Sequence, residues 1–157
     1  MSNYNRAFSL VEVLVASAIL ITIVVGVFGA LKLYAQVSAQ DAEKTQATLL
    51  AEEAGEAMQL MRDVSWSSQI APLTLGTTYY LVWDDGSYVA TTTRTVVDGR
   101  FVRTITLRSV TRNSSDQIAA SGTSDEGTRL VQVAVLRAAD SEQLVDSEFL
   151  VHNLYEE

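Results

Sequence analysis

An apolar run near the N-terminus limits the possible folds more than any other feature of the chain. Residues 13–31 are about 19 nearly uninterrupted apolar residues, with Arg6 before them and Lys32 directly after. A helix needs roughly 20 such residues to cross about 30 Å of hydrocarbon. Glu12 is the one ionisable side chain between Arg6 and Lys32. A charge near the centre of a spanning helix costs roughly 2.5–3.5 kcal/mol on insertion scales, so Glu12 requires a compensating role.

Three interpretations of this run compete. The first is a cleaved secretory signal peptide with a small-residue site near residues 27–29, but Glu12 would weaken its recognition. The second is an uncut signal anchor, in which Glu12 lies near the headgroups, where its charge costs little. The third is a processed N-terminus that serves for assembly, and it depends on the residues around Glu12.

Those residues favour the third interpretation. The segment AFSLVEVLVA, residues 7–16, resembles the prepilin signal of type IV pilins and type II secretion pseudopilins. That family has a short, slightly basic leader, a small residue, Phe or Met, a few apolar or hydroxyl residues, and a glutamate before a long apolar helix. The resemblance implies that residues 1–7 are a leader, that prepilin peptidase cuts between Ala7 and Phe8, and that the new amine of Phe8 is methylated.

The resemblance also implies a role for Glu12. In the family, the equivalent glutamate faces the N-terminal amine of an adjacent subunit in the filament. A carboxylate buried in apolar packing is tolerable when a cation neutralises it, and one buried polar pair can fix the alignment of packed helices. We therefore expect Phe8 and Glu12 to be the subunit-assembly residues. The implied partners are prepilin peptidase, other pilin or pseudopilin subunits, an inner-membrane assembly platform and, before assembly, membrane lipid.

Two features depart from the family's pattern. Ala7 stands where glycine is usual, although alanine is also small enough for a peptidase subsite. Gly26 and Gly29 stand in the region where many members have a helix-breaking proline. Since glycine costs about 1 kcal/mol in a helix interior, these two residues could loosen the helix there.

The same helix is predicted to run from Phe8 to Asp63. Residues 32–63 contain no proline and are rich in strong helix formers, while the polar stretch 40–48 indicates a neck. Apolar residues at spacings of three and four predict one buried stripe. The stripe consists of Tyr34, Val37, Leu50, Ala54, Ala57, Met58 and Met61. Acidic residues are expected on the solvent side, namely Asp41, Glu43, Glu52, Glu53 and Glu56.

The rest of the chain is predicted to form an antiparallel sheet. A loop is expected around residues 64–76, and a second, exposed loop over 112–127. β-Branched and aromatic residues predict strands at 77–83, 87–97, 100–110, 129–139 and 143–155. The Asp-Gly pairs at 85–86 and 98–99 are turn signals, so consecutive strands should form a meander. The predicted fold class is therefore α+β, pilin-like, with a long N-terminal helix packed on an antiparallel sheet and a head spanning 32–157.

The composition argues against several functions. A net charge of −8 argues against sequence-independent binding of nucleic acid. The absence of cysteine excludes thiolate chemistry and disulfides. Asp84 and Asp85 are adjacent and fit a turn better than an acid–base pair. Residues 124–127 with Asp116 offer oxygen ligands but lack the spacing of a calcium loop. His152 is expected at a strand surface or rim, so we expect no catalytic residue, metal site or cofactor.

Together these patterns predict a structural subunit of a type IV pilus or type II secretion pseudopilus, a minor subunit rather than a major one. The missing cysteines remove the disulfide-closed loop that many major pilins carry. Arg6 on the N-terminal side predicts a single-pass precursor in the cell membrane with its head outside the cytoplasm, and later a place in the filament. The alternative is a signal-anchored extracytoplasmic binding module.

Overall fold

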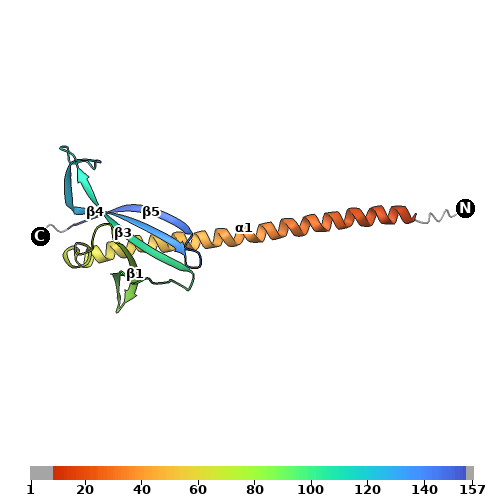
Figure 1. Cartoon of the computed structure of the whole chain (residues 1–157), viewed down its shortest axis with the longest axis horizontal. Helices are drawn as coiled ribbons and strands as arrows, with labels where there is room; N and C mark the ends of the chain where they lie inside the picture. Colours follow the sequence, from red (N-terminus) through yellow and green to blue (C-terminus); the bar gives the residue numbers. More distant parts are fainter. Residues whose placement is uncertain (1–8, 155–157) are drawn as a thin grey trace, which may run out of the picture. The chain divides into compact units, whose positions relative to one another are not determined.

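One long helix and a five-stranded sheet make up the described part of the chain. The computed structural model describes residues 9–154. Helix α1 spans Leu10–Val64, and a short π-helix, η1, spans Trp66–Ile70. The strands are β1 (Thr78–Asp84), β2 (Ser87–Thr91), β3 (Phe101–Arg112), β4 (Thr123–Arg137) and β5 (Gln143–His152). All paired strands are antiparallel, in the order β2-β1-β3-β4-β5, which confirms the predicted α+β class (Figure 1).

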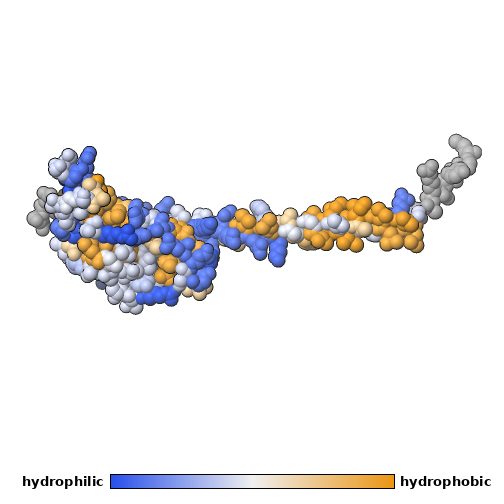
Figure 2. All heavy atoms as spheres, turned by 45° about the horizontal axis from the view of Figure 1, so that its top comes forward, coloured by the Kyte–Doolittle hydropathy of each residue, from blue (hydrophilic) through white to orange (hydrophobic). Residues whose placement is uncertain are grey.

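The chain divides into two compact units, one ending at Ala42 and the other beginning at Glu43. In the first unit, every described residue from Ser9 to Ala42 is exposed. Figure 2 shows hydrophobic residues, in orange, covering the N-terminal half of α1. Water-soluble monomers rarely expose so large a contiguous apolar surface, so this part of α1 requires lipid or partner helices around it.

The second unit has its core between the C-terminal part of α1 and one face of the sheet. Alanines on this part of α1 are small enough for the helix to lie close to the strands, and Met58 and Met61 fill the remaining space. The predicted stripe is confirmed from Leu50 to Met61, although Tyr34 and Val37 in the first unit are exposed. The buried residues of the strands include Phe101, Ile105, Leu107, Val131, Val133, Val135 and Val151.

The strand order shows that the predicted meander is wrong. The Asp98-Gly99 turn does form, with positive φ angles of 51° and 67°. However, β2 ends at Thr91 and pairs only with β1, while β1 also pairs with β3. β1 carries the buried Tyr79 and Leu81, so it takes the interior position and leaves the shorter, more exposed β2 at the edge. A local turn signal was outweighed by burial, which decides which strands become neighbours.

The first turn signal and the loop after α1 have different outcomes. Asp85 and Gly86 have φ angles of 42° and 81° and connect β1 to β2, because Asp84 pairs with Ser87. This matches the predicted turn.

The region after α1 is not entirely loop, since η1 forms within it. The side chain of Ser65 accepts a hydrogen bond from the Ser68 amide at 3.2 Å and so caps that π-helix.

The predicted loop at 112–127 is wrong in its second half. β4 begins at Thr123, and Thr123 pairs with Arg112 of β3. The paired ends of β3 and β4 and the loop between them, residues 110–125, form an arm that extends from the sheet (Figure 1). The register shifts between Ser109 and Val110, so residues 126–128 of β4 form a bulge at the base of the arm. A bulge bends its strand, which here redirects the arm.

Gly122 is required where β4 begins. Its φ is 153°, and a Cβ at this position would overlap the carbonyl group of Arg112. Gly122→Ala should therefore open the arm and speed amide hydrogen exchange in residues 110–125 by at least about 30-fold, equivalent to about 2 kcal/mol. Gly127→Ala is the matched control, since its Cβ would lie 3.4 Å from Asp125 Oδ1, an ordinary contact. Equal exchange rates in the two variants would contradict this account of the arm.

Candidate assembly site

Glu12 lies in the first turn of α1, with an exposed side chain. Its amide donates a hydrogen bond to the carbonyl of Ser9 at 3.0 Å. A carboxylate in the first turn of a helix is favoured by the helix dipole by about 0.3–1 kcal/mol. This is less than the cost of placing its charge in apolar surroundings, so Glu12 still needs a cation there. The predicted processing residues, Ala7 and Phe8, lie outside the described residues.

α1 is the one helix in the described part of the chain that is long and apolar enough to cross a membrane, by length and composition. Two hydroxyl groups within the apolar run bond to the helix itself. Ser17 Oγ donates to the carbonyl of Leu14, and Thr22 Oγ1 donates to the carbonyl of Ala18, each at 2.9 Å. A segment that lies in hydrocarbon must satisfy its polar groups with hydrogen bonds of its own, because no water is available there. Among residues 9–31, Glu12 is then the one charged side chain.

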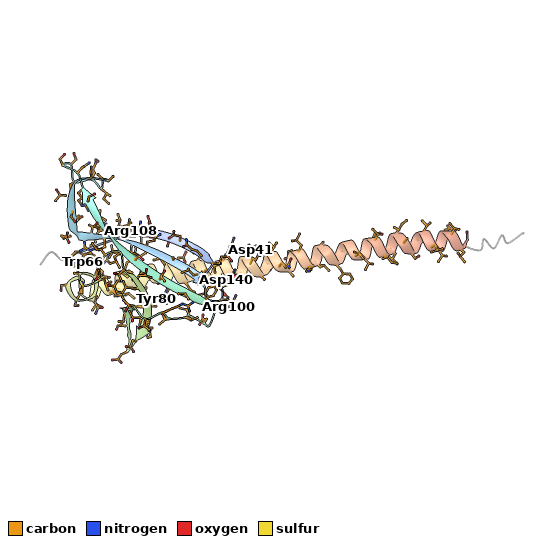
Figure 3. All side chains as sticks on the ribbon, in the orientation of Figure 1. Asp41, Trp66, Tyr80, Arg100, Arg108 and Asp140 are labelled. Carbon is orange, nitrogen blue, oxygen red and sulfur yellow. The ribbon has the colours of Figure 1, made fainter. Side chains whose placement is uncertain are left out.

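At the start of the second unit, Glu43 of α1 is bound to Arg137 of β4. Arg137 donates from Nε and Nη2 to the two carboxylate oxygens of Glu43, at 2.9 and 2.7 Å. Arg137 Nη1 also donates to Asp140 at 2.9 Å, and Arg100 Nη2 lies 3.9 Å from Glu43. Figure 3 shows Arg100 and Asp140 at the same end of the sheet. Hydrogen bonding from Arg137 lowers the pKa of Glu43. The expectation that Glu43 lies on the solvent side is therefore wrong, because it joins the helix to the sheet.

A second carboxylate of α1, Glu53, binds an arginine buried under the helix. Arg103 of β3 is only 4% exposed, and its Nη1 donates to Glu53 at 3.0 Å and to the Leu50 carbonyl at 3.3 Å. The hydroxyl of Tyr88 on β2 also donates to Glu53, at 2.8 Å. Partial burial raises the pKa of Glu53, but the hydrogen bonds from Arg103 and Tyr88 outweigh it, so the net pKa is lowered. Glu53 thus binds two side chains of the sheet while its own side chain stays 43% exposed, so the predicted solvent side is confirmed for it in part.

Arg129 holds the bulge of β4. It is 7% exposed, and its Nη1 donates to the carbonyl groups of Asp125, Glu126 and Thr128 at 3.3, 3.0 and 3.0 Å. Its guanidinium carbon lies 5.8 Å from the centre of the Trp66 ring, within range of a cation–π interaction. The role of Arg129 was not predicted from the sequence, because the alternation of apolar and polar residues along a strand does not reveal a bulge.

In the oxygen-rich segment at residues 124–127, the carboxylate of Asp125 is engaged in hydrogen bonds within the chain. The Asp125 carboxylate accepts from Thr128 Oγ1 and Arg112 Nε, both at 2.6 Å, and from the Gly127 amide at 2.9 Å. Bonds from Thr128 and Arg112 lower the pKa of Asp125. Thr128 Oγ1 also lies 3.0 Å from Nδ1 of the half-buried His152, which belongs to this network. Residues 9–154 contain no group of three or more His, Asp or Glu side chains placed to hold a metal ion.

The lowered carboxyl pKa values make stability depend on pH. Besides Glu43, Glu53 and Asp125, Asp140 has a lowered pKa, caused first by the backbone amide of Glu142 and then by Arg137. Such groups stabilise the fold above their unfolded pKa, and the contribution is lost as pH falls through the lowered folded value. We expect the Tm of the full chain in detergent to be flat above about pH 5.5 and to fall below about pH 4.5. Glu43→Gln should reduce that fall, and a Tm that rises on acidification would contradict the assignment.

Comparison with known proteins adds the deciding observation for the N-terminus. Residues 2–28 match the family model described as the Prokaryotic N-terminal methylation motif. The chain carries a prepilin-type signal. This motif is typical of type IV pilins and type II pseudopilins, which confirms the resemblance at residues 7–16. The chain matches no curated protein and no solved structure.

The prepilin-type signal and the fold agree. A signal of this kind leading into a long apolar helix, with that helix packed on an antiparallel sheet, makes the protein pilin-like. The prepilin signal implies processing by prepilin peptidase and assembly with pilins. The signal also suggests a membrane-anchored precursor that is then assembled into a pilus. The resemblance of the protein to pilins points to a structural role.

Proposed function

We propose that this pilin-like protein is a minor structural subunit of a type IV pilus or a type II secretion pseudopilus. The observation that carries the proposal is Glu12, an acidic residue within the matched signal and in the first turn of a helix whose described residues are all exposed up to Ala42. An exposed apolar helix needs lipid or other helices around it. A single carboxylate at the start of this helix favours packing among other helices over lipid, because a neighbouring subunit can supply a cation.

The proposal divides the chain by role. Residues 1–7 are the leader, residues 8–31 are the membrane-spanning and assembly helix, and residues 32–157 are the extracytoplasmic head. Before assembly, the apolar surface of residues 8–31 contacts lipid. After the leader is removed, the same surface packs against neighbouring helices in the filament. No catalytic step is assigned to the protein.

Glu12 aligns the subunits in this proposal. Cleavage between Ala7 and Phe8 creates an α-amino group, and methylation of that amine retains its positive charge. The carboxylate of Glu12 in an adjacent subunit neutralises the amine of Phe8 as both enter apolar packing. Phe8 and Glu12 are four positions apart in the sequence, so the pairing places the two subunits at a fixed, short displacement along the helix axis.

The minor role rests on two features of the sequence. The sequence VEVLVA at residues 11–16 resembles the sequences of minor pilins and minor pseudopilins more than those of major ones. The chain has no cysteine, so it lacks the disulfide-closed loop that many major pilins carry. A minor subunit occupies few positions along a filament, which gives the proposal a visible consequence.

Locating the protein on filaments tests this function. The full chain with a C-terminal epitope tag is expressed in cells that have an assembly machine, and sheared filaments are labelled with gold-conjugated antibody. We expect sparse or end-located label that disappears when prepilin peptidase is deleted. Continuous labelling along the shaft would overturn the minor role alone. Retention in the membrane with an intact Met1 would instead support the signal-anchored binding module.

A further inference from the structure

An apolar groove lies between the C-terminal end of α1 and the turn that joins β1 to β2. The groove has a volume of about 290 Å³, and its lining includes Leu60 and Val64 of α1, Trp83 of β1 and Tyr88 of β2. None of the described residues that line it is charged. Leu60, Val64 and Trp83 are 54%, 72% and 61% exposed, so large apolar side chains meet water together at this one place.

Trp83 lies on the core face of the sheet but is largely uncovered. Side chains alternate along β1, and Trp83 follows the buried Tyr79 and Leu81 on the same face. Tyr88 is its direct partner on β2, and the two rings meet edge to face with their centres 4.9 Å apart. The apolar face therefore extends beyond the packed core and ends at an exposed aromatic ring. Tryptophan and tyrosine are enriched at protein interfaces, where one side of the ring is apolar and the other is wet.

Carboxylates flank the groove on the side of the helix and on the side of the turn. Glu56 lies one helical turn before the groove on α1, while Asp84 and Asp85 stand where β1 turns into β2. Burial first, and then the carboxylates of Glu53 and Glu56, raise the pKa of Tyr88, which places Glu56 near the lining. Within residues 9–154, no lysine or arginine forms a salt bridge with Glu56, Asp84 or Asp85.

The positive groups on the adjoining elements are already bound. Arg62 pairs with Asp63 at 2.8 Å, and Arg103 pairs with Glu53 at 3.0 Å. Each of these two pairs is neutral as a whole. The rim of the groove therefore carries a net negative charge.

We propose that this groove binds a segment of a different protein in which large apolar side chains are flanked by lysine or arginine. The apolar side chains cover Leu60, Val64 and Trp83, and the cations approach the carboxylates of the rim, so the two surfaces are complementary in charge. The volume suits a few side chains of a polypeptide, since small-molecule pockets usually begin at about 300 Å³. The inference concerns the head alone and does not depend on how the N-terminal helix assembles.

The charge of the rim disfavours other occupants. A second copy of the chain that docked through the same groove would bring two acidic rims together, and like charges facing each other weaken an interface. Anionic lipid and nucleic acid would be repelled for the same reason. A segment with both apolar and basic side chains is stabilised by the groove and by its rim at once.

Photo-cross-linking in living cells tests the occupant. The photoreactive residue p-benzoylphenylalanine replaces the exposed Val64 in the full chain, and adducts are mapped by mass spectrometry. We expect an adduct with another protein, at a segment that has lysine or arginine beside apolar residues. An adduct with a second copy of the chain, with lipid, or with an acidic or uncharged segment would overturn the inference, and so would the absence of any adduct.

Matched variants separate the groove from the rest of α1. Leu60→Gln keeps a good helix former and should reduce the adduct at least about fivefold. Leu49→Gln is the control and should stay within about twofold, since Leu49 is 58% exposed on the same helix but does not line the groove. Trp83→Ala should reduce the adduct at least about tenfold. Equal amounts of adduct from the Leu60 and Leu49 variants would contradict the assignment.

The charge requirement is tested with peptides on the full chain in phosphatidylcholine nanodiscs. A short peptide of alternating lysine and leucine should bind, whereas the matched glutamate–leucine peptide should not. Glu56→Gln combined with Asp85→Asn should weaken binding at least about fivefold, and Glu52→Gln combined with Asp98→Asn should change it less than about twofold. Asp85 and Asp98 are exposed, precede glycines and have positive φ angles of 42° and 51°, which asparagine tolerates. Equal binding of both peptides, or equal loss in both double variants, would overturn the inference.

Discussion

A chain carrying Glu12→Ala should enter filaments at least about 100-fold less often than the wild type, while its amount in the membrane stays the same or rises. Removal of one partner from a buried ion pair costs about 3–5 kcal/mol, here by leaving the Phe8 amine without its anion. The same change removes a charge from the membrane-spanning segment, whose cost is at most roughly 2.5–3.5 kcal/mol, the value for the helix centre. The opposite signs of the two effects separate an assembly role from a folding defect.

The controls for this experiment are two neighbouring substitutions. Glu12→Gln keeps the shape of the side chain and should fail nearly as severely as alanine, because the missing charge is the cause. Val13→Ala removes apolar surface at the next position and should enter filaments within a few-fold of the wild type. Immunoblots of sheared filaments and of membranes give both quantities for each variant. Glu12→Ala chains that enter filaments normally would contradict the role assigned to Glu12.

Glu53→Ala should lower the free energy of unfolding by about 2–4 kcal/mol. Arg103 would stay buried with only the Leu50 carbonyl as acceptor, and its Nε already has no hydrogen-bond partner among the described residues. Breaking a buried ion pair costs about 3–5 kcal/mol, and the partial exposure of Glu53 reduces that figure. The expected fall in Tm is about 10 °C for a unit of this size, measured on the full chain in detergent.

Two further variants distinguish the ion pair from a general effect on α1. Glu52→Ala changes the exposed neighbouring glutamate and should alter stability by less than about 0.5 kcal/mol. Glu53→Leu combined with Arg103→Met removes both charges and should recover most of the loss, because apolar pairs often replace buried ion pairs without penalty. Equal effects of Glu53→Ala and Glu52→Ala would show that Arg103 does not depend on Glu53.

The features predicted correctly from the sequence depend on residues close together in the chain. The helix follows from an uninterrupted run of helix formers, and its buried stripe from Leu50 to Met61 follows from their spacing. The turn at Asp85 and Gly86 follows from the backbone conformation that these two residues favour. The prepilin-type signal is likewise contained within residues 2–28, so a short pattern was enough to find it.

The errors concern contacts between distant residues. Glu43 lies 94 positions from Arg137, and nothing in the local pattern of α1 shows that a glutamate will meet an arginine of β4. The pairing of β3 with β1 instead of β2 depends on which strand covers more of the core. Arg103 is a partial exception, since it falls on the buried side of β3 between Phe101 and Ile105, where a charge requires a partner.

The N-terminus of the protein recovered from filaments shows whether the leader is removed before the subunit is assembled. Intact-mass and peptide mass spectrometry of sheared filaments and of membranes would identify that terminus in both fractions. We expect chains beginning at Phe8 with a methylated amine in the filaments. Chains that begin at Met1 in the membrane and are absent from every filament preparation would contradict this expectation.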